Sequence, residues 1–200
     1  MPDAQPEIVL ASQNPGKVAE MRELLAGQPW RVRGVGALGI HEAPEETGTT
    51  FRENALLKAR YYAGRAGGLV VADDSGLSVD ALDGAPGLYT SRFGGPGLSD
   101  DDRNRLLLRK LDGVAEAERG ARFTSAVALV RNGEILFEAV ETCEGRIASE
   151  AAGDQGFGYD PVFFYPPFGT TMGCVPPEQK ATVSHRGKAF ARLAKFLATL

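Results

Sequence analysis

The pattern of hydrophobic and polar positions predicts three long helices in this chain. Apolar side chains recur three and four residues apart over residues 14–27, over residues 49–68 and over the closing stretch 184–200. That spacing places them on one face of a helix. Glycines at Gly27 and Gly67–Gly68 are typical of helix ends, so they close the first two helices.

Shorter apolar or alternating runs predict strands. Residues 7–12 form a short apolar run, residues 30–35 alternate, and residues 69–73 form an apolar run that ends in a carboxylate. Residues 121–148 contain two strand-like runs joined by Asn132–Gly133, the strongest short signal for a β-hairpin. One further strand-like run, broken by prolines, covers residues 157–167.

Polar residues ahead of the helical stretches supply candidate caps. Thr49 or Thr50 can cap the helix within 49–68, and Ser184 can cap the last one, because hydroxyl oxygens accept from the free N–H groups of a first turn. The acidic run Ser99–Asp102 marks the start of a further helix, since negative charge is favourable at a helix N-terminus.

The order of the elements predicts the fold class. A β-α-β-α-β beginning is followed by an antiparallel middle and a C-terminal helix, which indicates an α/β protein with a mixed sheet flanked by helices, in two lobes around a central cleft. A length of 200 residues suits one domain, 1–200, built from these two lobes. Residues 1–6 are expected to form a flexible tail.

Composition narrows the partners and the compartment. Hydrophobic residues make up 43% of the chain, which is ordinary for a globular protein. The net charge is -4, so the chain lacks the excess of basic residues that is typical of nucleic-acid-binding proteins. No apolar run approaches the ~20 residues of a membrane helix, and the N-terminal residues 1–7 lack a signal-peptide pattern. Cys143 and Cys174 have no metal-ligand spacing and are expected to be free thiols. We therefore expect a cytoplasmic protein without a membrane or nucleic-acid partner.

The segment Ser12–Lys17, "SQNPGK", is the first candidate site. It joins a predicted strand to a predicted helix, and the free N–H groups of a helix N-terminus suit phosphate. Ser12 and Asn14 are small and polar, Gly16 allows close backbone approach, and Lys17 adds a cation. An ordinary capped helix with a surface lysine would explain the same residues.

Two acidic segments form the second candidate site. Glu45 and Glu46 lie in a polar loop, and Asp73 and Asp74 follow an apolar strand. Neighbouring residues of a strand point to opposite sides, so one aspartate can face a ligand while the other braces the turn. Carboxylates from separate segments, with phosphate oxygens and water, suit Mg²⁺. Solvated acidic loops are the alternative.

Aromatic and basic residues near the C-terminus form two further candidates. In "GFGYDPVFF", residues 156–164, glycines separate aromatic rings that could stack on a base, although a tight turn with core aromatics is an equal explanation. Lys180, His185 and Arg186 gather at the start of the last helix, where cations oppose the helix dipole. A bound anion would explain this placement, and so would an exposed basic helix end.

Jointly, the four motifs resemble the inosine/xanthosine triphosphatase family of non-canonical purine nucleoside triphosphate pyrophosphatases. The resemblance covers residues 8 to 198. It is carried by "SQNPGK", "EETGTTFRENALLKA", "ADDSGLSVDALDGAPGLYTSRF", "GFGYDP" and "SHRGKA". It implies an elongated α/β fold, a homodimer, and Mg²⁺-dependent hydrolysis of ITP, dITP and XTP to the monophosphate and pyrophosphate, which cleans the nucleotide pool.

The resemblance also implies roles for individual residues. Asp74 would accept the proton of the attacking water, and Glu46 and Asp74 would bind Mg²⁺. The remaining residues would bind the substrate: Ser12, Gln13, Asn14, Pro15, Gly16, Lys17, Lys58 and Ser75 at the phosphates, and Phe157, Gly158, Tyr159, Asp160, Lys180, His185 and Arg186 around the base and nucleotide.

Other functions stay open on the residues alone. A Maf-like nucleotide pyrophosphatase shares similar chemistry and would accept other bases. A phosphomonoesterase would release orthophosphate, and it usually carries a DxD motif that "ADDSG" lacks. A nucleotide-binding module without turnover would not need Glu46, Asp74 and Lys17 intact. Covalent Ser/His catalysis is not expected, because the chain has no G-x-S-x-G motif.

Overall fold

The computed structural model describes residues 5–200 and divides into two compact units. The first contains the chain up to Asp74 together with Ser125–Glu141 and Gly187–Leu200, and the second contains Ser75–Thr124 and Thr142–Arg186. Three strands, β3, β4 and β5, contribute residues to both units. The cleft expected between two lobes stays a prediction.

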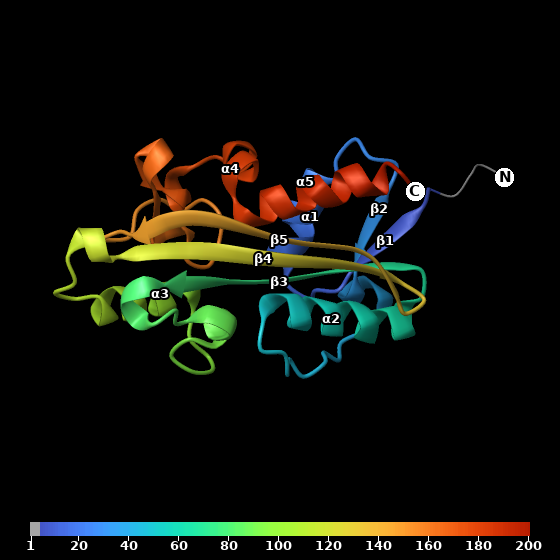
Figure 1. The fold of residues 1–200 in the computed structure, drawn as a ribbon, viewed down its shortest axis with the longest axis horizontal. Helices are drawn as coiled ribbons and strands as arrows, with labels where there is room; N and C mark the ends of the chain where they lie inside the picture. Colours follow the sequence, from blue (N-terminus) through green and yellow to red (C-terminus); the bar gives the residue numbers. More distant parts are fainter. Residues whose placement is uncertain (1–4) are drawn as a thin grey trace. The chain divides into compact units, whose positions relative to one another are not determined.

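Seven strands and five α-helices make up the regular structure of residues 5–200 (Figure 1). The strands are β1 (Glu7–Leu10), β2 (Arg31–Gly34), β3 (Leu69–Val79), β4 (Gly120–Arg131), β5 (Glu134–Ile147), β6 (Phe163–Tyr165) and β7 (Thr170–Thr171). The helices are α1 (Pro15–Leu24), α2 (Phe51–Ala66), α3 (Asp100–Lys110), α4 (Pro177–Val183) and α5 (His185–Leu197). Short 3₁₀ helices lie in several connections.

The strands form one mixed sheet in the order β2-β1-β3-β4-β5-β6-β7. β1 runs parallel to both of its neighbours, with Ile8 opposite Val32 of β2 and Leu69 of β3. β6 runs antiparallel to β5 and to β7. The predicted α/β class with a mixed sheet is therefore confirmed.

Alternating residues of the strands build two hydrophobic cores in the first unit. Ile8 and Leu10 pack with residues of α1 and α5, whereas Val9 and Ala11 pack with residues of α2. The same alternation continues in β3 and β4. Figure 1 accordingly shows α5 on one side of these strands and α2 on the other. A strand that is buried on both faces reads as a continuous apolar run, as residues 8–11 do.

Side-chain caps begin three of the helices. Asn14 accepts from the N–H groups of Gly16 and Lys17, Thr50 accepts from the N–H of Glu53, and Ser99 forms a capping box with Asp102. Each cap satisfies N–H groups that have no partner inside the helix. The predicted starts at Thr50 and Ser99 are confirmed, and α1 ends at Leu24, three residues before the predicted stop.

The predicted hairpin is present at Asn132–Gly133, which joins β4 to β5. Both residues have positive φ, 52° at Asn132 and 86° at Gly133. A two-residue turn of this kind needs left-handed backbone at both positions, and asparagine and glycine adopt it at the lowest cost.

Two sequence-based boundaries differ from the structure. β3 was expected to end at Asp73 but continues to Val79, because Leu77 and Val79 are buried in the core of the second unit. The strand-like run 157–167 contains two short 3₁₀ helices, with β6 limited to Phe163–Tyr165. Its prolines cannot donate to a ladder, which shortens the strand.

The second unit has its own core, in which aromatic side chains are prominent. Phe123 of β4 lies 4.5 Å from Phe163 of β6, measured between ring centroids. Leu107 and Leu111 of α3 are fully buried in the same cluster. This core supports the segment that carries Phe157–Asp160, since Tyr159 is itself a member of the cluster.

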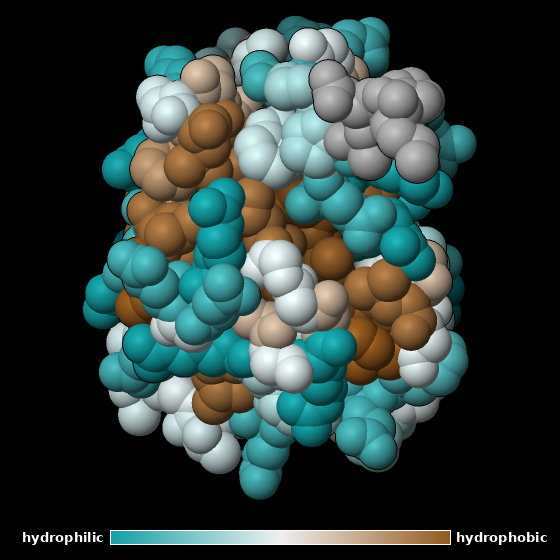
Figure 2. All heavy atoms as spheres, turned by 90° about the vertical axis from the view of Figure 1, so that its right-hand side faces the viewer, coloured by the Kyte–Doolittle hydropathy of each residue, from teal (hydrophilic) through white to brown (hydrophobic). Residues whose placement is uncertain are grey.

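Hydrophobic side chains reach the surface at scattered points. Figure 2 shows brown hydrophobic groups on one face, bordered by teal hydrophilic ones. Apolar side chains at the surface are ordinary, because polar atoms are too few to cover a whole protein. Of the tail expected at residues 1–6, the first four lie outside the described residues, and Gln5 and Pro6 are exposed. No helix within residues 5–200 is long and apolar enough to cross a membrane.

Candidate active site

Asp73 and Asp74 contact different partners, although they are consecutive in β3. Asp73 is 2% exposed, and its carboxylate lies 2.7 Å from Nζ of Lys17 and accepts a hydrogen bond of 2.6 Å from Oγ of Ser125. Asp74 is 8% exposed, and its carboxylate accepts a bond of 2.5 Å from Nζ of Lys58. The alternation of a strand sends the two side chains to opposite faces, as predicted.

Lys58 joins two carboxylates that come from separate segments. Its Nζ, on α2, lies 2.5 Å from Asp74 and 3.2 Å from Oε1 of Glu46 in the preceding loop. The loop is held in place because Asn54 Oδ1 accepts from the N–H of Gly48 at 2.8 Å. A Cβ on Gly48 would lie 2.6 Å from that same oxygen, so the close approach requires glycine. Glu46 and Asp74 therefore converge on one point.

The electrostatics of this group favour positive charge. Burial raises the pKa of Asp74 above its ordinary value, and Lys58 offsets this only in part. Burial would lower the pKa of Lys58, but the charge and hydrogen bond of Asp74, with the charge of Glu46, raise it. The raised pKa of Asp74 follows mainly from its burial, and the raised pKa of Lys58 follows from the two carboxylates, Asp74 and Glu46, that it contacts.

The residue types around Lys58 fit a hard divalent cation. Glu46 and Asp74 supply carboxylate oxygens, the ligands that Mg²⁺ prefers, and they already converge on a cation. Two protein carboxylates completed by water and phosphate oxygens are the usual pattern for Mg²⁺. Within residues 5–200, no group of three or more histidine, cysteine or acidic side chains is placed to hold a metal ion.

The segment Ser12–Lys17 is organised around the start of α1. Asn14 Oδ1 accepts from the N–H groups of Gly16 at 2.8 Å and Lys17 at 3.3 Å, and Ser12 Oγ accepts from the N–H of Asn14. The side chain of Lys17 turns toward Asp73. The N–H groups expected to meet phosphate thus have an acceptor in Asn14, which a bound phosphate would share or replace.

The candidate nucleotide residues of the second unit surround Phe157. Asp160 accepts from Nζ of Lys180 at 2.6 Å and from the N–H of Phe157 at 2.9 Å. Lys180 Nζ and Arg186 Cζ lie 5.3 Å and 5.4 Å from the centre of the Phe157 ring. Arg186 also donates to Oγ of Ser75 at 2.8 Å. These contacts bring predicted residues from three distant parts of the sequence together.

His185 and Tyr159 are packed into the second unit. The His185 ring is buried and stacks on Phe123, with centroids 4.8 Å apart and an interplanar angle of 11°. The Tyr159 hydroxyl donates to the carbonyl of Thr90 at 2.9 Å, and burial raises the pKa of this tyrosine well above its ordinary value. Tyr159 is therefore a neutral hydrogen-bond donor that anchors the segment.

A family model described as the Ham1 family matches residues 8–196. The chain belongs to the Ham1 family. A dITP/XTP pyrophosphatase of Methylococcus capsulatus is 49% identical over 197 residues, which cover 97% of each chain. A second one, from Exiguobacterium, is 46% identical over 94% of each chain.

Solved Ham1 structures share the fold. The HAM1 protein of Coxiella burnetii superposes with a TM-score of 0.85 at 38% identity, covering 98% of this chain and all of that one. A structure described as a nucleoside-triphosphatase, dITP/XTP pyrophosphatase of Mycobacterium abscessus has a TM-score of 0.72 at 42% identity, covering 94% of this chain and 98% of that one.

The predicted site residues of this Ham1 chain fall into two groups. In the first unit, Glu46, Lys58 and Asp74 form one cluster of charges, Lys17 pairs with Asp73, and the segment Ser12–Lys17 begins α1. In the second unit lie Ser75, Phe157, Gly158, Tyr159, Asp160, Lys180, His185 and Arg186.

Several residues that hold this Ham1 site in place had no signal in the sequence. Ser125 donates to Asp73, which lies 52 residues away in the sequence. Asn54 accepts from the N–H of Gly48 and so holds the loop that contains Glu46. Thr90 accepts from Tyr159, and its hydroxyl accepts from the N–H of Leu77 at 2.9 Å. Each of these side chains is a common polar residue within an ordinary strand, helix or loop, so its role depends on tertiary contacts.

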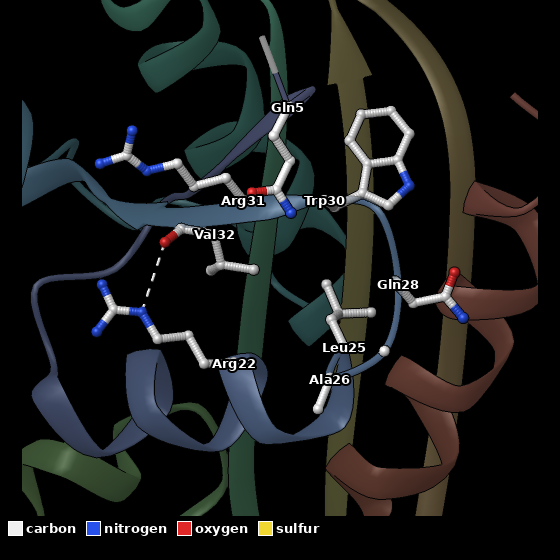
Figure 3. Close-up of a pocket in the computed structure, with 9 residues that line it drawn as sticks. Gln5, Arg22, Leu25, Ala26, Gln28, Trp30, Arg31 and Val32 are labelled. Carbon is white, nitrogen blue, oxygen red and sulfur yellow. Dashed lines mark hydrogen bonds between the residues drawn. The ribbon is translucent and has the colours of Figure 1, made fainter. Parts of the chain in front are cut away.

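Two cavities of the first unit lie along α1, each of about 430 Å³. One includes Ser12, Gln13 and Pro15 of the predicted phosphate segment and also His41. The other lies at the C-terminal end of α1 and contains none of the predicted residues (Figure 3). It is lined by Gln5, Arg22, Leu25, Ala26, Gly27, Gln28, Trp30, Arg31 and Val32.

Proposed function

We propose that this protein hydrolyses ITP, dITP and XTP between the α and β phosphates, releasing a nucleoside monophosphate and pyrophosphate. The observation that carries the proposal is the convergence of Glu46 and Asp74, from separate segments, on one cationic position. The names of the Methylococcus and Mycobacterium relatives, both dITP/XTP pyrophosphatases, support it. Such an enzyme removes unwanted purine nucleotides from the pool before they are used.

Glu46 and Asp74 would hold Mg²⁺. When bound, the ion would neutralise oxygens of the triphosphate and lower the pKa of the attacking water. The surplus of carboxylates over ammonium groups around Lys58 supports this assignment. Lys58, which contacts both carboxylates, would bind phosphate oxygens of the substrate.

Asp74 accepts the proton of the attacking water in this mechanism. Asp74 is a buried carboxylate held by the hydrogen bond from Lys58, and a positioned carboxylate can act as a general base. Lys17 and the N-terminus of α1, with Ser12–Lys17, place positive charge at the triphosphate. Hydrolysis of a phosphoanhydride needs mainly positioning and charge neutralisation, which these groups supply.

The second unit would recognise the base and the rest of the nucleotide. Phe157 would stack on the purine, with Gly158, Tyr159 and Asp160 enclosing it. Lys180, His185 and Arg186 would complete the nucleotide pocket, and Ser75 would contact the phosphates. Hypoxanthine and xanthine present a 6-oxo acceptor, whereas adenine presents a 6-amino donor. Hydrogen-bond donors at that position therefore reject ATP, because two donors would face each other unpaired.

We also propose that the enzyme is a cytoplasmic homodimer acting as a single pyrophosphatase domain. Neither Cys143 nor Cys174 forms a disulfide bond, which suits a reducing compartment. The family resemblance supports the dimer. Light scattering coupled to size exclusion tests it directly, with a mass near twice 21.3 kDa expected.

A product assay tests the function. Purified protein with Mg²⁺ receives ITP, XTP, GTP or ATP, and pyrophosphate and orthophosphate are measured separately. We expect pyrophosphate from ITP and XTP, little from GTP or ATP, and loss of turnover when EDTA removes the metal. Orthophosphate as the product, or no turnover with any of the four, would show that the site serves another reaction or binding alone.

A further inference from the structure

Both peptide groups at Gly158 are held by α3. The N–H of Gly158 donates to Oδ2 of Asp100 at 2.9 Å, and its carbonyl accepts from Nδ2 of Asn104 at 3.0 Å. Asp100 and Asn104 are four residues apart, so they share one face of the helix. All three residues belong to the second unit.

Asn104 occupies a position of α3 that would ordinarily be apolar. It is 4% exposed and lies on the buried face with Leu107 and Leu111. Its Oδ1 is buried with no hydrogen-bond partner among residues 5–200. An unsatisfied buried group of this kind costs about 1–3 kcal/mol, and an apolar side chain of similar shape would avoid the cost. Stability therefore does not explain the amide, whereas its bond to Gly158 does.

The two hydrogen bonds at Gly158 add to other contacts that hold the segment Phe157–Asp160 in place. The N–H of Phe157 is held by Asp160, and the hydroxyl of Tyr159 is held by the carbonyl of Thr90. Gly158 has φ of +64°, a left-handed conformation that glycine adopts without strain. Helix α3 thus supplies one side chain to each of the two peptide groups that follow the Phe157 ring.

We propose that Asn104 and Asp100 are positioning residues that set base selectivity. By fixing the peptide groups at Gly158, they hold Phe157 and the backbone around it in the geometry that distinguishes a 6-oxo purine from a 6-amino purine. Discrimination of this kind is lost when the donors can shift and pair with the wrong base. A displacement of about 1 Å can lower the reaction rate by about 100-fold. The inference rests on the proposed base-binding role of Phe157–Asp160.

The test compares Asn104→Leu with Ser99→Ala. Asn104→Leu removes the bond to the Gly158 carbonyl and the unpaired Oδ1, whereas Ser99→Ala weakens α3 by about 1 kcal/mol but leaves both bonds. Asn104→Asp is a second variant that lacks the Nδ2 donor. Asp100→Ala and Asp100→Asn form a matched pair, because asparagine keeps an acceptor for the Gly158 N–H.

Equilibrium binding of IMP and AMP is the primary readout, since it needs no turnover, and kcat/KM for ITP and ATP is the second. We expect both Asn104 variants and Asp100→Ala to reduce the preference for the 6-oxo base by about tenfold or more, with the melting temperature of Asn104→Leu unchanged or raised. Ser99→Ala and Asp100→Asn should keep the preference.

Three results would overturn the inference: an unchanged preference in both Asn104 variants, an equal loss in Ser99→Ala, or a wild-type protein that binds neither nucleotide. A wild-type protein that prefers IMP but releases no pyrophosphate from ITP would contradict the proposed hydrolysis. The selectivity test would still stand in that case.

Discussion

Asp73 and Asp74 are joined by one peptide bond, yet their carboxylates pair with lysines on two different helices, Lys17 on α1 and Lys58 on α2. The strand alternation produces this separation, and the sheet is covered on both faces in the first unit. The two acids therefore have different surroundings and are expected to respond differently to substitution.

Replacing Asp74 should stop catalysis with little effect on folding. Asp74→Asn keeps the shape but cannot accept a proton, so we expect kcat for ITP to fall by about 10²- to 10⁴-fold. Steady-state kinetics and thermal unfolding measure the two effects. Asp112→Asn changes an exposed acid in the same way and should leave kcat unchanged. A near-normal kcat in Asp74→Asn would remove Asp74 from its proposed role.

Asp73 and Lys17 should be coupled in stability. Lys17→Met leaves the Asp73 carboxylate buried without its cation, and we expect a loss of about 2 kcal/mol. This loss is smaller than the cost of breaking a fully buried ion pair, which is about 3–5 kcal/mol, because 17% of the Lys17 side chain is exposed. Adding Asp73→Asn should restore most of the free energy of unfolding while KM for ITP stays raised.

Urea unfolding of the wild type, both single variants and the double variant measures that coupling. Additive losses in the double variant would mean that the two side chains contribute independently. Recovery of normal KM together with stability would mean that Lys17 does not contact the triphosphate.

Glu46 should control the requirement for Mg²⁺. Glu46→Gln removes one of the two carboxylates at the proposed metal position. The Mg²⁺ concentration for half-maximal rate should therefore rise by at least about tenfold, because loss of even a residue that supports a metal ligand lowers metal affinity by that much. Glu45→Gln is the matched control, since Glu45 is the exposed neighbour in the same loop. Equal effects in the two variants would point to general loop charge rather than a ligand.

Tyr159 should make stability depend on pH in the alkaline range. Burial raises the pKa of Tyr159, so the unfolded chain releases this proton first, near the ordinary value of 10.0. The stability that this hydroxyl contributes is complete below that value and declines as pH rises toward the folded pKa.

Tyr159→Phe isolates that contribution. At about pH 7 the variant should be less stable by about 1 kcal/mol, because the bond to the Thr90 carbonyl is lost. Between about pH 9 and pH 11 its free energy of unfolding should fall less steeply than that of the wild type. Parallel curves from urea titrations at each pH would contradict the assignment.

The sequence by itself determined the features whose energy is local. Ser99 and Thr50 cap helices through bonds to residues three positions away, and Asn132–Gly133 turns the hairpin through its own backbone preference. The apolar runs before Asp73 and at residues 8–11 likewise predicted strands, which the structure shows to be buried on both faces. These interactions span few residues, so the spacing of residue types is enough to predict them.

Only the tertiary structure decided how the site is held. Asp73 meets Ser125 across 52 residues, and Asn104 meets the Gly158 carbonyl across 54. The polar residues at 73–75 looked like a strand end, but β3 continues because Leu77 is buried in the core of the second unit. Contacts between distant segments depend on how elements pack, and a serine or an asparagine carries no local signal of the partner that packing will bring to it.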